Sequence, residues 1–425
     1  MCRVVVALGH SEMFFRSHPE PGWGPDFSHE NHRAGQASVS CVEVSHFPFC
    51  ESSFPAGAIQ FGLASPAAIG ETKIRSITPM KRSLFFLSAL AALCLVNGVH
   101  AQSAAPAKKV VFTFDPRFTD ADFSAIKQGA PNLNIVIAPP EKLMAEIADA
   151  DGIVGGITRE QVLAAKKLKW VQVNSAGVEN YVSIPELRNS PITLTNMKIV
   201  QGIEIADHAF ALLLGLTRRI DVAVANRATE TWPNLVTYGR PIELHGKTAV
   251  VIGVGGIGTQ VAVRAKAFGM TVVGVDPNDL PFTPYIDRSI PPDRLGDVLP
   301  EADVVFICAP HTPATDKMVG AAQFAKMKKG VWFIAVSRGK IYDNLALVEA
   351  LKSGHVAGAG LDVTEIEPLP KGHPLWSTGR VIITPHIAGR SDGDAGRYHE
   401  IHVENVIRFG RGERLRNVVD KEKGY

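Results

Sequence analysis

The glycine-rich segment 253–258, Gly-Val-Gly-Gly-Ile-Gly, constrains the fold of this chain more than any other feature. It directly follows the apolar run Thr248–Ile252, and a segment of helical pattern comes after it. A strand, a tight glycine turn and a helix in this order can hold a phosphate, because the backbone comes close to the anion and the helix N-terminus attracts it. Asp276 follows Gly258 by 18 residues, at the distance expected of a carboxylate that binds an adenosine ribose. The sequence therefore predicts a dinucleotide site.

Each glycine of this segment has an expected part. Gly253 allows the tight turn, Gly255 lets the backbone approach a pyrophosphate, and Gly258 lets the helix pack closely on the strand. The predicted cofactor contacts of the loop are Gly253, Gly255, Gly256, Ile257 and Gly258. The alternative is a purely structural turn, which the preceding strand, the following helix and the spacing to Asp276 disfavour.

Composition favours small-molecule chemistry. The chain has 425 residues, 46% of them hydrophobic and 20% charged, as in a globular protein of two or three domains. Its net charge of +2 is close to neutral. We find no basic stripe, zinc-ligand spacing or aromatic repeat, so neither nucleic acid nor a bound metal is expected.

The first hundred residues differ from the rest of the chain. Residues 1–79 are rich in Pro, Ser, Gly and His without helical or strand periodicity, and we expect them to be a non-native or disordered extension. Residues 80–101 have the layout of a secretory signal peptide: a basic start, an apolar run of 13 residues from Leu84 to Val96, and small residues at Val99 and Ala101. A membrane anchor is the alternative, but a spanning helix needs ~20 residues.

We therefore expect translation to start at Met80 and the mature chain to begin near Gln102, in the periplasm or outside the cell, with no membrane attachment. The alternative is a cytoplasmic protein, because nicotinamide nucleotides are expected to be scarce outside the cytoplasm. An export system that carries folded proteins with their cofactor would reconcile the export signal with the need for a nicotinamide cofactor. Residues 81–85 (Lys-Arg-Ser-Leu-Phe) faintly resemble the twin-arginine signal of such a system.

From residue 109 onward, short apolar runs alternate with helical patterns, which predicts α/β lobes with parallel sheets. The predicted strands are 109–114, 133–138, 152–156, 169–174 and 192–197 in a first series, and 248–252, 271–275, 302–309, 331–336, 357–363 and 381–384 in a second. A long helix over 203–220 is expected to join them, and a helix over 395–409 is expected near the end. We predict a substrate domain at 109–205, a nucleotide-binding domain with the linking helix at 206–390, and a return to the substrate domain at 391–425.

Three ionisable residues, Arg338, Glu367 and His386, come soon after apolar runs of the second series. Residues just past the carboxyl ends of parallel strands face the ligand crevice, so the three are expected to converge near the cofactor's reactive end. Taken singly, each has a structural alternative: Arg338 could form a surface ion pair, Glu367 could be an acidic residue in a turn before proline, and His386 could be a hydrogen-bonded core histidine.

Their order after the glycine loop resembles the D-isomer-specific 2-hydroxy acid dehydrogenases over about residues 109–420. The segments that carry the resemblance are Ser-Ala-Gly-Val at 175–178, Ala-Asp-His at 206–208, the loop 253–258 with Asp276, Pro-His-Thr-Pro-Ala-Thr at 310–315, Ser-Arg-Gly at 337–339, Gly-Leu-Asp-Val at 360–363 with Glu367, and Pro-His at 385–386. Segment 370–376 is similar to branches that reduce glyoxylate or hydroxypyruvate. The resemblance implies a flavodoxin-like substrate lobe, a Rossmann lobe and a homodimer.

The resemblance also implies roles for individual residues. Arg338, together with the backbone around Ala176 and Gly177, would bind the carboxylate of a short 2-oxo acid. His386 would exchange a proton with the substrate oxygen, and Glu367 would orient its imidazole and favour the imidazolium form.

For the cofactor, the resemblance implies that Asp362 would hold the nicotinamide carboxamide, while Pro310 and Thr315 would flank the cofactor. Asp276 favours NAD over NADP because a carboxylate repels a 2′-phosphate. The alternative function is a catalytically silent nucleotide-sensing or ligand-binding protein on the same fold, which the intact Arg338, Glu367 and His386 disfavour.

Overall fold

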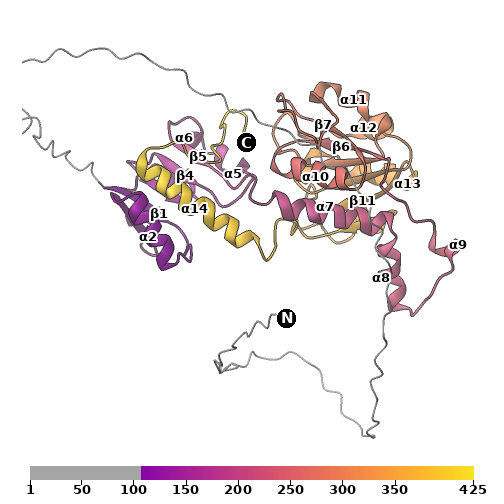
Figure 1. The fold of residues 1–425 in the computed structure, drawn as a ribbon, viewed down its shortest axis with the longest axis horizontal. Coiled ribbons are helices and arrows are strands. Elements are labelled where there is room, and N and C mark those ends of the chain that lie inside the picture. The colour runs from indigo at the N-terminus through magenta and orange to yellow at the C-terminus, as the bar shows by residue number, and fades with distance from the viewer. Residues whose placement is uncertain (1–106) are drawn as a thin grey trace, which may run out of the picture. The chain divides into compact units, whose positions relative to one another are not determined.

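The computed structural model describes residues 107–425, so the expected extension and signal peptide lie outside the described residues. Two parallel sheets organise this part of the chain (Figure 1). The first, with order β2-β1-β3-β4-β5, consists of β1 Lys108–Phe112, β2 Leu133–Ile137, β3 Gly152–Val154, β4 Trp170–Gln172 and β5 Thr193–Thr195. Its helices are α2 Asp120–Gly129, α3 Leu143–Ile147, α4 Arg159–Ala164, α5 Glu179–Val182 and α6 Pro185–Arg188. We call this unit the first lobe.

The second sheet has the order β12-β11-β10-β9-β6-β7-β8. Its strands are β6 Thr248–Ile252, β7 Thr271–Val275, β8 Arg288–Ile290, β9 Val304–Ile307, β10 Val331–Ala335, β11 Val356–Leu361 and β12 Val381–Ile383. Its helices are α10 Gly256–Ala267, α11 Leu295–Val298, α12 Ala321–Lys326 and α13 Asn344–Lys352. We call this unit the second lobe; every residue of its central strands β9 and β10 is buried, as expected where helices cover both faces of a parallel sheet.

All eleven predicted strands are present, with ends that differ from the expected bounds by at most two residues. Strand β8 was not predicted; it has only three residues, two of them exposed. Such a short edge strand carries no alternation or apolar run that could reveal it.

The predicted linking helix is α7, Gly202–Thr217, and it is followed by α8, Ile220–Ala228, and α9, Leu235–Tyr238. Helix α7 is apolar and packs against β10, β11, β12 and α10. Gly360 of β11 permits this contact, because a Cβ placed there would lie 2.7 Å from Cβ of Leu212. Figure 1 shows α7 in front of the second sheet, with α8 and α9 beyond its C-terminal end.

The chain returns to the first lobe through α14, Asp394–Arg411, and an extended tail. Val419 N donates to Leu194 O over 2.9 Å, so the tail pairs with β5 of the first lobe. Asn405, fully buried in α14, donates from Nδ2 to Gln172 Oε1 of β4 at 2.8 Å and accepts from Arg416 N at 2.7 Å. Leaving such a buried polar group unpaired would cost about 1–3 kcal/mol, so these bonds fix α14 on the first lobe.

Within residues 107–425, no helix is both long and apolar enough to span a membrane. Cys308 is buried beside β9, and burial raises the pKa of its thiol. The thiol therefore stays protonated and packs as a small apolar side chain rather than acting as a nucleophile.

Candidate active site

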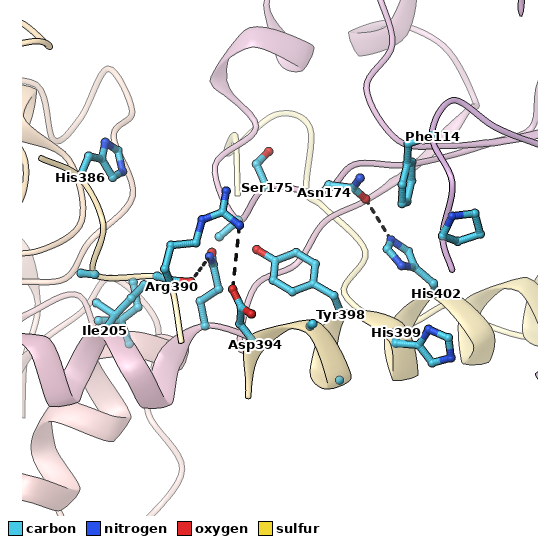
Figure 2. Close-up of a pocket in the computed structure, with 18 of the residues that line it drawn as sticks. Phe114, Asn174, Ser175, Ile205, His386, Arg390, Asp394, Tyr398, His399 and His402 are labelled. Carbon is cyan, nitrogen blue, oxygen red and sulfur yellow. Dashed lines mark hydrogen bonds and ion pairs between the residues drawn. The ribbon is translucent and has the colours of Figure 1, made fainter. Parts of the chain in front are cut away.

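A cleft of about 1040 Å³ opens where the strands of both lobes end. Its lining comes from the loops after β1 and β4, from the loops after β10 and β12, and from the first turns of α14. Figure 2 shows His386 on one side of the cleft and His402 of α14 on the other, with Arg390 and Tyr398 between them. Parallel strands bring their carboxyl ends to one edge, which explains why residues far apart in sequence meet here.

The glycine loop has the geometry that a dinucleotide requires. Gly253 has φ of +88°, and a Cβ there would lie 2.4 Å from Cα of Ala309. A Cβ at Gly258 would lie 1.9 Å from the Gly253 carbonyl oxygen, so the start of α10 touches the turn. In front of Gly255 nothing lies within 4 Å of such a Cβ. The open backbone at the N-terminus of α10 therefore fits a pyrophosphate.

The other two predicted residues of the loop have different surroundings. Ile257 lines the cleft. A Cβ at Gly256 would lie 2.7 Å from Cα of Ile199, in the segment that connects β5 to α7. Gly256 thus allows this connection to approach α10, a packing role beyond the predicted cofactor contact.

Asp276 lies at the mouth of the glycine loop. Its Oδ2 accepts from Val254 N at 2.9 Å, and its Oδ1 accepts from the backbone and side-chain nitrogens of Asn278 at 3.0 Å. A carboxylate has about four acceptor positions. One position therefore remains for a ribose hydroxyl, next to the place where the pyrophosphate fits.

Pro310 and Thr315 contact each other. Thr315 Oγ1 donates to the Pro310 carbonyl at 2.8 Å and accepts from Thr312 N at 2.8 Å, which closes the 310–315 loop on itself. Neither side chain lines the cleft. Their contact with a cofactor stays a prediction.

Arg338 lies in the loop after β10 and contacts the first lobe beside Gly177. Its Nη2 lies so close to Gly177 that a Cβ on this glycine would be 1.7 Å away. The Arg338 Nε donates to Glu179 Oε1 at 2.9 Å, and its Nη1 donates to the Ser337 carbonyl at 2.8 Å. The loop itself is held by Asn196, whose Nδ2 donates to the Ala176 carbonyl at 2.7 Å.

Glu179 was not among the predicted site residues. Its position two residues after Gly177 was the available signal, because a carboxylate beside a loop that receives an arginine is a candidate ion-pair partner. The pair fixes the plane of the guanidinium and leaves Nη2 and one hydrogen of Nη1 free to donate.

His386 and Glu367 form the predicted pair. The Nδ1 atom of His386 lies 2.7 Å from Glu367 Oε2, and the other carboxylate oxygen accepts from Thr364 N at 2.9 Å. Because the carboxylate accepts, Nδ1 carries a hydrogen, and Nε2 is left for exchange with a ligand. His386 lines the cleft, and its φ of +55° lies in the left-handed region, where a non-glycine residue is strained.

The turn that holds His386 in this conformation is bound to the buried carboxylate of Asp362. Its Oδ1 accepts from Thr384 Oγ1 at 2.6 Å and from Ile387 N at 3.0 Å, and its Oδ2 accepts from Ala388 N at 3.0 Å. One acceptor position on Oδ2 remains. Asp362 thus organises the turn, a role that was not anticipated, and its predicted contact with a carboxamide stays a prediction.

His208 of α7 extends this network. Its Nε2 lies 2.8 Å from Thr384 Oγ1. The Thr384 hydroxyl gives its only hydrogen to Asp362, so its oxygen accepts and His208 Nε2 is the donor. The Ala-Asp-His segment marked this position, but sequence alone did not assign it a contact.

Comparison with known proteins places these features in a family. The sequence model of the NAD-binding domain of D-isomer specific 2-hydroxyacid dehydrogenases matches residues 210–388. A glyoxylate reductase of Korarchaeum cryptofilum is 36% identical over 298 residues, which cover 67% of this chain and 88% of that protein. A D-3-phosphoglycerate dehydrogenase of Methanocaldococcus jannaschii is 35% identical, and the match spans 66% of this chain but only 53% of that longer protein.

Solved structures agree. The crystal structure of an NADPH-dependent glyoxylate/hydroxypyruvate reductase from Sinorhizobium meliloti, in complex with NADP and sulfate, is 26% identical with a TM-score of 0.62. The match covers 75% of this chain and all of that one. This chain belongs to the D-isomer specific 2-hydroxyacid dehydrogenase family.

Proposed function

We propose that this protein interconverts a short 2-oxo acid and its D-2-hydroxy acid with NAD(H), with His386 as the acid and base. The observation that carries the proposal is the His386–Glu367 contact of 2.7 Å in a cleft that Arg338 and Ile257 of the glycine loop also line. The alternative, a silent nucleotide-binding protein, would not need a histidine paired with a carboxylate beside an arginine.

Arg338 is the residue that binds the substrate carboxylate. Its guanidinium is planar and permanently charged, so its free Nη1 and Nη2 hydrogens can donate to neighbouring oxygens of a 2-oxo acid. The contacts with Glu179 and Ser337 hold this plane in place before the substrate binds. The side chain is therefore already ordered in the free protein, and less conformational entropy is lost when the substrate binds.

His386 moves the proton. In reduction, Nε2 donates to the carbonyl oxygen of the substrate, and in oxidation it accepts the hydroxyl proton. Glu367 stabilises the imidazolium that donates the proton in reduction and that forms in oxidation, since a carboxylate favours the charged ring. A bound nicotinamide cofactor supplies or accepts the hydride.

Substitution of His386 tests this assignment. His386→Asn should lower kcat by roughly 10²–10⁴, the usual loss for a positioned acid/base, while NADH binding measured by fluorescence titration stays unchanged. Arg338→Lys should raise the KM of the substrate and lower kcat, because a point charge cannot donate a planar pair of hydrogen bonds.

For both variants, rates are measured from the loss of NADH absorbance with a panel of 2-oxo acids. Wild-type rates in either variant would refute the role assigned to that residue.

We propose NAD rather than NADP as the cofactor. The carboxylate of Asp276 is at the mouth of the glycine loop, with Asp279 three residues beyond it, and no basic side chain lies among residues 277–280. A ribose 2′-hydroxyl can donate to Asp276, whereas a 2′-phosphate would be repelled by it.

Cofactor preference should therefore depend on this carboxylate. In the double variant Asp276→Ser with Asn278→Arg, the ratio of kcat/KM for NADPH to that for NADH should rise about tenfold or more, the value of one charge-assisted hydrogen bond. The matched control is Asn278→Arg alone, in which Asp276 still repels the phosphate. Equal kcat/KM for the two cofactors in the unmodified enzyme would contradict the proposal.

We propose that the protein is a homodimer that uses the segment of α8 and α9. Trp232 and Val236 are 97% and 90% exposed there. Two large apolar side chains so exposed on one segment are typical of a protein contact. Trp232→Ser combined with Val236→Ser should shift the sedimentation-equilibrium mass from dimer to monomer. Phe282→Ser is the matched control, because Phe282 is 99% exposed on another loop. A monomeric wild-type protein would refute the proposal.

We also propose that the protein is exported and cleaved after Ala101. Protein isolated from its host should then begin near Gln102, fractionate with periplasmic contents and yield no peptides from residues 1–79. Leu90→Asp with Leu93→Asp should retain it in the cytoplasm, since each charge in an inserting segment costs about 2.5–3.5 kcal/mol. Leu63→Asp is the control and should leave export unchanged. An uncleaved protein in the cytosol would overturn the export proposal and leave the catalytic proposal intact.

A further inference from the structure

Between His386 and the wall that carries His402, the cleft presents hydrogen-bond donors that the proposed reaction does not use. They are Asn174, Tyr398 and Arg390, all of which line the cleft. Figure 2 shows the Arg390 side chain and the Tyr398 hydroxyl in the middle of the view, with Asn174 and His402 to their right.

Asn174 is held with its amide nitrogen free. Burial lowers the pKa of His402 to about 4, so its ring is neutral near pH 7. The His402 Nε2 lies 2.9 Å from Asn174 Oδ1, and because a carbonyl oxygen only accepts, Nε2 carries the hydrogen. Asn174 Nδ2 keeps both of its hydrogens, and no acceptor for them occurs among the described side chains and backbone groups.

Tyr398 and Arg390 are donors for related reasons. Burial raises the pKa of Tyr398 to about 12, so its hydroxyl keeps its proton, and within residues 107–425 it has no hydrogen-bond partner. The side chain of Arg390 is 82% exposed, and its contact with Asp394 is a long one of 3.9 Å. A guanidinium so weakly paired can bind a ligand without first breaking a strong contact.

Acceptors that could balance these donors are few. The cleft is lined by two carboxylates, Asp362 and Asp394. Asp362 is engaged by Thr384 and two backbone amides, and Asp394 is largely buried beside Arg390. The histidines on this wall are also engaged, His402 with Asn174 and His399 with Asp122 at 2.8 Å. Besides Arg338, two arginines line the cleft, Arg117 and Arg390, so a ligand group that enters here meets cations and several neutral donors.

We propose that Arg390, Tyr398 and Asn174 bind a second anionic group at the far end of the substrate, a carboxylate or a phosphate. This inference rests on the proposed function, since Arg338 is taken to bind the carboxylate next to the reacting carbon. The substrate class is then a 2-oxo dicarboxylate or a phosphorylated 2-oxo acid, rather than one with an apolar end. Charged oxygens that accept from a guanidinium, a phenol and an amide gain shorter and stronger bonds than neutral acceptors do.

Pairs of substrates that differ only in the distal charge test this inference. We would measure kcat/KM with NADH for 2-oxoglutarate against its C5 amide, and for phosphohydroxypyruvate against hydroxypyruvate. The unmodified enzyme should prefer the charged member of at least one pair by about tenfold or more, and the preferred pair distinguishes carboxylate from phosphate. Arg390→Gln should remove most of this preference, and it should lower kcat/KM for 2-oxobutyrate by a much smaller factor than kcat/KM for the charged substrate. Tyr398→Phe should reduce the preference by a smaller factor.

Arg414→Gln is the matched control, because Arg414 is an exposed arginine of the tail that does not line the cleft. Equal kcat/KM for charged and neutral members would overturn the inference and leave the dehydrogenase proposal standing. A rise in the KM of NADH with every substrate in Arg390→Gln would overturn it by assigning Arg390 to the cofactor. If no 2-oxo acid is reduced at all, the proposed function fails, and this inference fails with it.

Discussion

The buried carboxylate of Asp362 is the interaction on which the rest of the site depends. An ionised group that is 2% exposed is costly unless hydrogen bonds replace its water. Thr384, Ile387 and Ala388 provide those bonds, and all three belong to the turn that carries His386. The carboxylate thus holds the turn, and the turn satisfies the carboxylate. This mutual stabilisation can sustain the left-handed backbone of His386, which would otherwise relax toward a commoner conformation.

The lobes contribute to the site unequally. The second lobe supplies the glycine loop, Arg338 and the pair of His386 and Glu367, whereas the first supplies the surface against which the guanidinium lies. The Glu179–Arg338 pair joins them, and both side chains are 32% exposed. Solvent screens a pair with such exposure, so its contribution to stability is small and its value is geometric: it sets the plane in which Arg338 can donate.

Sequence patterns predicted much of this architecture because parallel strands are continuous apolar runs and the glycine loop has steric requirements that no other residue meets. The His386–Glu367 contact was predicted from the resemblance, and both residues come soon after predicted strands.

The contacts that were not predicted involve pairs of segments rather than single segments. Contacts of Glu179, His208 and the α14 wall join segments more than 150 residues apart, and nothing in the periodicity of one segment identifies its partner in another. Strand β8 was missed because three mostly exposed residues give no pattern.

Helix α14 explains how such a site can keep its chemistry while its specificity changes. The groups assigned to proton transfer and carboxylate binding lie on loops of the second sheet, where Asp362 and Glu179 fix them. The far wall of the cleft belongs largely to α14, which Asn405 and the tail anchor to the first lobe. Arg390 lies before this helix, in the loop that also carries His386. A substitution at Arg390 or Tyr398 changes the donors offered to the distal end of a substrate without touching the bonds that orient His386. Under the proposed roles, selection at the distal end of a substrate and the reaction itself depend on different side chains, so one can be altered while the other is kept.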